Sequence, residues 1–116
     1  MRPLAHVATE ADDDVSVAAI EGEVDASNVE GIGVQLRALL TNHSHALVVD
    51  LRETHYLDSA GLNLLFALVA ELDHRQQRLH VVVDPASHVA RTLQLVNLAA
   101  VAAVHPTRAE ALADAR

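Results

Sequence analysis

Apolar and polar positions change their period several times along the chain, and each change predicts a different element. Residues 15–24, VSVAAIEGEV, are rich in β-branched side chains and follow the polar turn 12–14, which predicts a strand. A shorter strand over residues 6–9 pairs with it as an opening hairpin. The runs ALVVDL (46–51) and LHVVVD (79–84) are continuously apolar, as in strands covered on both faces.

Four segments carry apolar residues at helical spacing. The first lies within residues 25–43, where Ser27 and Glu30 form a capping box at its start. The second follows residue 58, and Glu71 with Arg75 forms an i,i+4 ion pair on its exposed side. The apolar stripes of these two helices consist of Val29, Ile32, Leu36, Leu39 and Leu40, and of Leu62, Leu65, Phe66, Val69 and Leu72.

Two further helices close the chain. Ser87 caps the third helix, whose apolar stripe is Val89, Leu93 and Val96. A short apolar segment, residues 99–104, then leads to the fourth helix over residues 109–115, which opens with Thr107 and Glu110 as a second capping box.

The order of these elements is β-β-α-β-α-β-α-β-α. Two buried strands joined by a helix form a βαβ unit, which is right-handed and parallel in almost every known case. No linker, repeat or low-complexity segment interrupts the order. The sequence therefore predicts one α/β domain over residues 1–116, with its core at about 5–115, a mixed central sheet and about four helices.

Composition and charge narrow the class of partner. Apolar residues make up 51% of the chain and only Tyr56 and Phe66 are aromatic, so the core consists of aliphatic side chains. The basic residues are eight Arg and no Lys against 16 acids, and the net charge is −8. This balance argues against nucleic acid and anionic membrane surfaces as partners and fits a protein partner with a basic patch.

The absence of Cys excludes disulfides and thiolate metal sites and is typical of a reducing compartment. The first residues, MRPLAHVATEADDD, contain no continuous apolar stretch of the kind found in signal peptides. No run reaches the roughly 20 apolar residues that a membrane span needs. We expect a cytoplasmic protein without direct membrane insertion.

The segment HYLDSAGLNLL, residues 55–65, is the candidate functional loop. It follows a strand and opens a helix, and ligand chemistry in α/β sheets collects at the C-terminal ends of strands. Asp58 or Ser59 can cap the helix, and a phosphate on Ser59 would gain from the helix dipole. Gly61 costs helix stability in a first turn, and its bare backbone would permit close approach by another molecule.

Other chemistries fit the residues poorly. His55, Asp58 and Ser59 are triad residue types, but neighbours on one loop rarely converge and the G-x-S-x-G elbow is absent. A receiver domain and a phosphate-binding loop both need a Lys, which the chain lacks. His43 and His45 have no third ligand at suitable spacing, so no metal site is predicted.

Three segments resemble STAS domains, and specifically small anti-anti-sigma factors (anti-sigma factor antagonists). They are EGEVDASN (21–28), ALVVDLRETHYLDSAGLNLL (46–65) and HVVVDPASHVARTLQLVNL (80–98), in the family's order and spacing. The resemblance covers roughly residues 5–115. It implies a STAS-like fold that agrees with the predicted element order, with no catalytic activity and no cofactor.

The resemblance also implies a partner switch. The unmodified domain would bind an anti-sigma factor that is itself a serine kinase with a histidine-kinase-like ATP fold. Phosphorylation of the motif serine, here Ser59, would release the domain, and a serine phosphatase would reset it. Asp25 and Asp58 match the two family acids that flank this serine, and Gly61 is expected in the same phosphosite environment. The expected partner contacts are Leu62 and Asn63, at the exposed start of the helix, together with Ser27, Asn28 and Ala60.

The chain also departs from the family pattern. Asn63 stands where the family usually has Gly, HRQQR (74–78) lacks a common Gly, and LVNL (95–98) replaces a Thr-Gly turn. These departures favour an alternative, a non-switching STAS adaptor or scaffold subunit in a signalling assembly or a lipid-transport complex, with Ser59 only capping the helix. A third class, small-molecule sensing in the loop, lacks a phosphate cradle.

Overall fold

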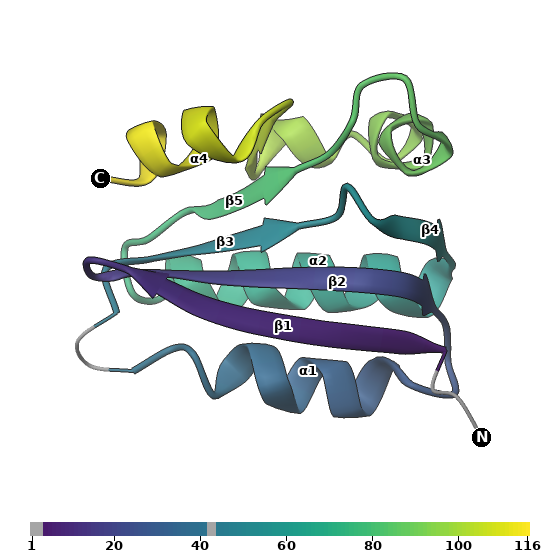
Figure 1. Cartoon of the computed structure of the whole chain (residues 1–116), viewed down its shortest axis with the longest axis horizontal. Coiled ribbons are helices and arrows are strands. Elements are labelled where there is room, and N and C mark those ends of the chain that lie inside the picture. The colour runs from purple at the N-terminus through teal and green to yellow at the C-terminus, as the bar shows by residue number, and fades with distance from the viewer. Residues whose placement is uncertain (1–3, 42–43) are drawn as a thin grey trace.

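The computed structural model describes residues 4–41 and 44–116, which are built around a mixed six-stranded sheet (Figure 1). Its strands run in the order β1-β2-β3-β5-β6, and β4 pairs with β2 beyond the end of β3. Only β1 is antiparallel to its neighbour. The strands are β1 (Ala5–Asp12), β2 (Val15–Val24), β3 (Ala46–Asp50), β4 (Thr54–Leu57), β5 (Leu79–Val82) and β6 (Ala103–His105).

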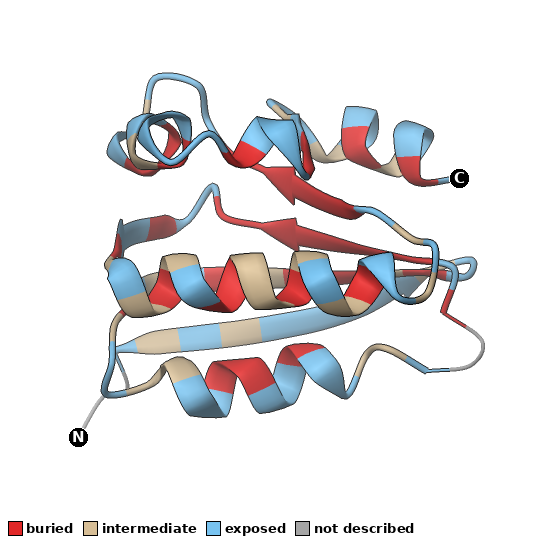
Figure 2. Ribbon diagram, turned by 180° about the vertical axis from the view of Figure 1, so that it is seen from behind, coloured by how far each residue is buried: buried red, intermediate tan, exposed pale blue. Residues whose placement is uncertain are grey.

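Four α-helices pack on this sheet, as predicted, and a short 3-10 helix, η1 (Leu98–Ala100), precedes β6. Helices α1 and α2 cover one face of the sheet, whereas α4 covers β3, β5 and β6 on the other face (Figures 1 and 2). The helices are α1 (Val29–Arg37), α2 (Ser59–Asp73), α3 (His88–Leu95) and α4 (Arg108–Ala115). Within the described ranges, no helix is both long and apolar enough to cross a membrane.

The central strands β3 and β5 are buried on both faces, as their apolar runs predicted. Along β3, Leu47 and Val49 belong to the large core cluster under α1 and α2. Their neighbours Ala46 and Val48 belong to the smaller cluster under α4. Successive side chains of a strand point to opposite faces, so one five-residue strand supports both layers of helices.

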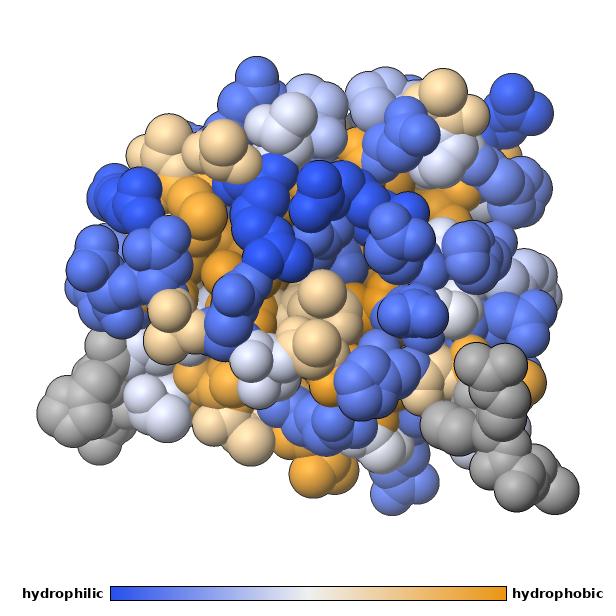
Figure 3. All heavy atoms as spheres, viewed as in Figure 1, coloured by the Kyte–Doolittle hydropathy of each residue, from blue (hydrophilic) through white to orange (hydrophobic). Residues whose placement is uncertain are grey.

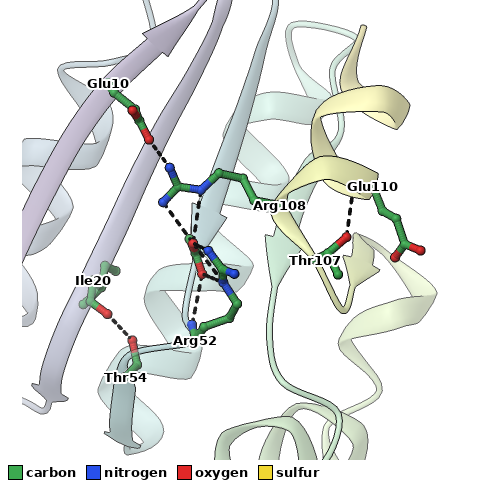
Figure 4. A network of polar contacts seen from close by, with 8 residues as sticks. Glu10, Ile20, Arg52, Thr54, Thr107, Arg108 and Glu110 are labelled. Carbon is green, nitrogen blue, oxygen red and sulfur yellow. Dashed lines mark hydrogen bonds and ion pairs between the residues drawn. The ribbon is translucent and has the colours of Figure 1, made fainter.

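Strand β4 is the one strand of the described structure that the sequence pattern did not predict. THYL has no apolar run, and both His55 and Tyr56 are exposed. The segment is a strand because it pairs with the far end of β2, and the buried Thr54 hydroxyl donates to the Ile20 carbonyl over 2.6 Å (Figure 4). The pairing shifts register beside Gly22, whose φ of +109° favours glycine.

The predicted helix caps are only partly correct. Ser87 accepts a hydrogen bond from the Ala90 N–H, and Thr107 accepts one from the Glu110 N–H, so both cap their helices. The Ser27 capping box is wrong, because α1 begins after Asn28 without a side-chain cap. The Ser27 hydroxyl donates to Asp25 instead, which removes it from the end of the helix.

Two other local predictions differ from the structure. Glu71 does not pair with Arg75, since it accepts a hydrogen bond of 2.9 Å from Arg37 of α1 and thereby joins the two helices. Arg75 donates to the Thr41 carbonyl. Val96 lies just after α3 and is exposed, so it is not part of the buried stripe of that helix.

Asp50, the last residue of β3, is the centre of a charged network that includes Arg52 and Arg108, which are labelled in Figure 4. Its carboxylate is 5% exposed and accepts hydrogen bonds from Arg52 at 2.8 and 3.0 Å and from Arg108 at 3.0 Å. Arg108 also pairs with Glu10 on β1. The network therefore ties α4 to both β1 and β3, and hydrophilic residues gather over the middle of the face that Figure 3 shows.

Burial acts to raise the pKa of Asp50, but hydrogen bonds from Arg52 and Arg108 outweigh burial and hold the pKa below its ordinary value. The folded state therefore keeps the carboxylate charged at a pH where the unfolded chain already binds a proton. The stabilisation is fully present above pH 3.8 and is lost as the pH falls through the lower pKa of the folded state.

Gly61 lies in the first turn of α2 and is buried against the end of the sheet. A Cβ on Gly61 would lie 2.3 Å from Leu57 Cδ1 and 3.1 Å from Val24 Cγ1. The missing side chain therefore lets α2 pack on β4 and β2. The reason given for Gly61 from the sequence, close approach by another molecule, is wrong in this structure because its own core occupies the space.

Substitutions at two glycines test this packing. Gly61→Ala should lower the free energy of unfolding by about 1–3 kcal/mol, because Leu57 must move to admit the methyl group. Gly31→Ala in α1 is the matched control: nothing lies within 4 Å of its Cβ position, so it should raise stability by about 0.5–1 kcal/mol. Urea denaturation measures both, and equal changes at the two positions would contradict the packing account.

Asp50→Asn tests the charged network. At pH 7 the variant should lose about 1–3 kcal/mol, because charge-assisted hydrogen bonds to two partly exposed Arg side chains are weakened. The difference from the wild type should shrink as the pH falls below 3.8, where the wild-type carboxylate also loses its charge. Urea denaturation from pH 7 to 3 measures this, with the exposed Glu21→Gln as the control; a constant difference would refute the assignment.

Candidate functional site

Two acidic loops lie side by side at the C-terminal edge of the sheet. Val24 of β2 and Leu57 of β4 are partners in the parallel ladder, so Asp25 and Asp58 each follow the last residue of neighbouring strands. The Asp58 N–H donates to the Val24 carbonyl over 3.2 Å and joins the two loops directly. The pairing of β4 with β2 is therefore what brings these two sequence motifs together.

Asp58 is the N-cap of α2. Its Oδ1 accepts hydrogen bonds from the N–H groups of Ala60 at 2.9 Å and Gly61 at 3.2 Å. The backbone of Asp58 is extended, as is usual for this position. Of the two residues that the sequence offered as the cap, Asp58 has this role.

Ser59 is the first residue of α2 and is exposed. Within residues 4–41 and 44–116, its hydroxyl makes no hydrogen bond to another group of the protein. It is therefore not occupied in capping, and it remains open to a second molecule. The same geometry provides no nucleophile activated by a base, because neither His55 nor Asp58 bonds to this hydroxyl in the described structure.

The loop after β2 is held by its own polar groups. Asp25 accepts hydrogen bonds from the Ser27 hydroxyl at 2.5 Å and from the Ser27 N–H at 2.9 Å. The hydroxyl is the main cause that holds the pKa of Asp25 below its ordinary value. Asn28 accepts from the Asp25 N–H at 3.0 Å and donates to the Glu23 carbonyl at 2.8 Å. Asp25 thus presents a fixed negative charge.

The remaining predicted contact residues occupy the first turns of α2. Asn63 is exposed, whereas Ala60 and Leu62 are half-buried, and Leu62 packs partly against the core. Ser59 precedes them in the same helix, and the exposed Ser27 lies in the neighbouring acidic loop. Their roles in phosphorylation and partner contact stay predictions.

Comparison with known proteins identifies the family. Residues 7–106 match the family model described as "Mlab, STAS domain". The structure resembles an anti-sigma factor antagonist from Mycobacterium paratuberculosis, with a TM-score of 0.87 and 28% identity over 97% of this chain and 94% of that one. It also resembles a putative anti-sigma factor antagonist from Thermotoga maritima, with a TM-score of 0.85 and 20% identity over 95% and 94% of the two chains.

A third similar structure is the phosphorylated form of the Bacillus cell fate determinant SpoIIAA, with a TM-score of 0.68 and 19% identity over 96% of this chain and all of that one. At identities of 20% and below, the resemblance shows a shared fold. The family model covers most of the chain and matches the region that contains both acidic loops, the six strands from residue 7 of β1 onward, and helices α1, α2 and α3. The chain belongs to the STAS domain family.

Proposed function

We propose that this chain is an anti-sigma factor antagonist that is switched off by phosphorylation of Ser59. Its partner is an anti-sigma factor that is also a serine kinase of histidine-kinase-like ATP fold, and a serine phosphatase restores the unmodified form. The observation that carries the proposal is the exposed Ser59 hydroxyl, which has no partner in the described structure although it stands at the start of a helix.

The comparisons support this proposal at the level of the class. The protein with 28% identity is named as an anti-sigma factor antagonist, and SpoIIAA has been solved in a phosphorylated form. In this chain the motif serine is intact, and its neighbour Asp58 supplies the cap. Phosphorylation of Ser59 would therefore leave the cap of α2 in place.

The local charge explains how a phosphate could act as a switch. A phosphoserine adds about −1.5 to −2 charges at neutral pH. Two N–H groups at the start of α2 are already bonded to Asp58, so the helix end offers the phosphate fewer donors than a free helix end would. The Asp25 and Asp58 side chains also repel the phosphate, which disfavours its packing against either acidic loop. The phosphate would therefore point away from the domain, towards the partner.

A modest penalty at the interface is enough for release. A partner surface that fits a neutral hydroxyl must desolvate the phosphate beside an existing carboxylate, and a loss of about 1.4 kcal/mol already lowers affinity tenfold. Leu62 and Asn63 lie one turn further along α2, where they would contact the same partner. The chain acts in this proposal as a binding protein and as the substrate of a kinase, without catalysis of its own.

A second candidate is a non-switching STAS adaptor or scaffold subunit in a signalling assembly or lipid-transport complex. It is favoured by the description of the matching family model, which names Mlab and not a sigma regulator. In this case the first turn of α2 would still be a contact surface. The charge at Ser59 would then have no regulatory effect.

Phosphate transfer tests the acceptor site. The kinase is the ATP-binding protein that co-purifies with the untagged full chain, and it is incubated with radiolabelled ATP. The wild type should be labelled on serine, and Ser59→Ala should lose the label, whereas Ser87→Ala should keep it because the Ser87 hydroxyl caps α3. Serine label in Ser59→Ala, located by mass spectrometry, would show that another residue is the acceptor.

Partner affinity separates the two candidates. Ser59→Asp should weaken binding to the co-purified partner at least about tenfold, because a charge enters the contact surface. Ser87→Asp is the matched control: it adds the same charge at the N-terminus of α3 and should change affinity less than about threefold. Calorimetry measures both dissociation constants. Unchanged affinity in Ser59→Asp would favour the adaptor over the switch.

A further inference from the structure

Three side chains of types that commonly bind metals lie close together on the face of the sheet that carries α4, opposite α1 and α2. They are His80 of β5, His105 of β6 and Asp114 of α4. Among the described residues this is the one group of three or more His, Cys, Asp or Glu side chains whose ligand atoms lie within 4.8 Å of one another. None of the three belongs to the acidic loops around Ser59.

The strand pairing explains why the two imidazoles meet. In the parallel ladder, His80 is opposite Ala103 and Val82 is opposite His105, so the histidines project from the same face two positions apart. Helix α4 packs on this face and contributes Asp114 from its last turn. Residues 25 and 34 positions apart in the sequence thereby form one cluster.

The three candidate metal-ligand atoms of this cluster are separated by nearly equal distances. His80 Nδ1 lies 3.4 Å from His105 Nε2, and Asp114 Oδ2 lies 3.5 Å from the first nitrogen and 3.3 Å from the second. All three separations exceed the 2.7–3.2 Å of ordinary N–H···O hydrogen bonds. Ligands at about 2.0–2.1 Å from a tetrahedral Zn²⁺ are about 3.3–3.4 Å apart. The triangle therefore has the size of a metal site.

The two imidazole rings are nearly parallel, with their centroids 5.6 Å apart and 16° between their planes. His80 Nδ1 and His105 Nε2 are the ring atoms that also approach Asp114 Oδ2. His80 is 5% exposed, whereas Asp114 is half-exposed, so the cluster is open to solvent on one side.

We propose that His80, His105 and Asp114 form a binding site for a Zn²⁺-class transition metal, with solvent as the fourth ligand. Two imidazoles and one carboxylate are a ligand set typical of Zn²⁺, whereas Mg²⁺ and Ca²⁺ prefer oxygen ligands. A bound ion would cross-link α4 to β5 and β6. It would stabilise the folded chain, because the unfolded chain does not hold these ligands together.

The experiment uses the full chain without a polyhistidine tag, titrated with Co²⁺ as a coloured probe and then with Zn²⁺. We expect one Co²⁺ per chain, with the intense visible absorption of four-coordinate cobalt, and its displacement by Zn²⁺. Excess Zn²⁺ at about 100 times its dissociation constant should raise the melting temperature by roughly 10 °C. Absence of saturable one-to-one binding would overturn the proposal.

Variants on α4 locate the site. Asp114→Asn replaces an exposed ligand and should leave the fold intact, yet it should weaken Co²⁺ binding at least about tenfold. Glu110→Gln is the matched control, because it removes an exposed acid from the same helix outside the cluster and should leave the affinity unchanged. His105→Ala should abolish the visible band, and circular dichroism checks that it is folded. Equal affinities in Asp114→Asn and the wild type would overturn the assignment.

Discussion

Parallel pairing of β2 with two successive segments of the chain is the constraint on which the rest of the structure depends. The first half of β2 pairs with β3, and its last residues pair with β4. Residues 51–53, between β3 and β4, leave the sheet. As a result, Asp50 at the end of β3 lies beside α4, and Asp58 after β4 lies beside Asp25. The core, the charged network and the candidate loop all follow from this one arrangement.

The regular elements were predictable because their signals are local. The buried strands β3 and β5 are continuous apolar runs, and Ser87 and Thr107 precede helices that they cap. Strand β4 had no such signal, since its four residues are held by β2 and by the Thr54 hydroxyl. The helix-start signal at Ser27 failed for a different reason. Asp25, two residues earlier, accepts a hydrogen bond from the Ser27 hydroxyl, and the sequence does not show which of two local contacts is stronger.

The sequence grouped the residues of the candidate site in one motif but did not show which role each of them has in the structure. The motif placed Asp58, Ser59 and Gly61 together, yet cap, free hydroxyl and packing contact are separate roles that only the three-dimensional arrangement assigns. The need for glycine at position 61 comes from the side chains of Leu57 and Val24, which belong to two different strands and fill the space that a Cβ would occupy. The cluster of His80, His105 and Asp114 could not be found from spacing, because it depends on which strands are neighbours and on where α4 crosses them.

The role of Asp58 determines what kind of switch Ser59 can support. Because the carboxylate already holds the Ala60 and Gly61 N–H groups, α2 does not need the serine hydroxyl for its start and would not need a phosphate there. Modification of Ser59 would therefore alter the surface charge without breaking a bond of the described fold. In the proposed switch, the domain keeps its shape and the change is detected by the partner, through repulsion and desolvation at the interface.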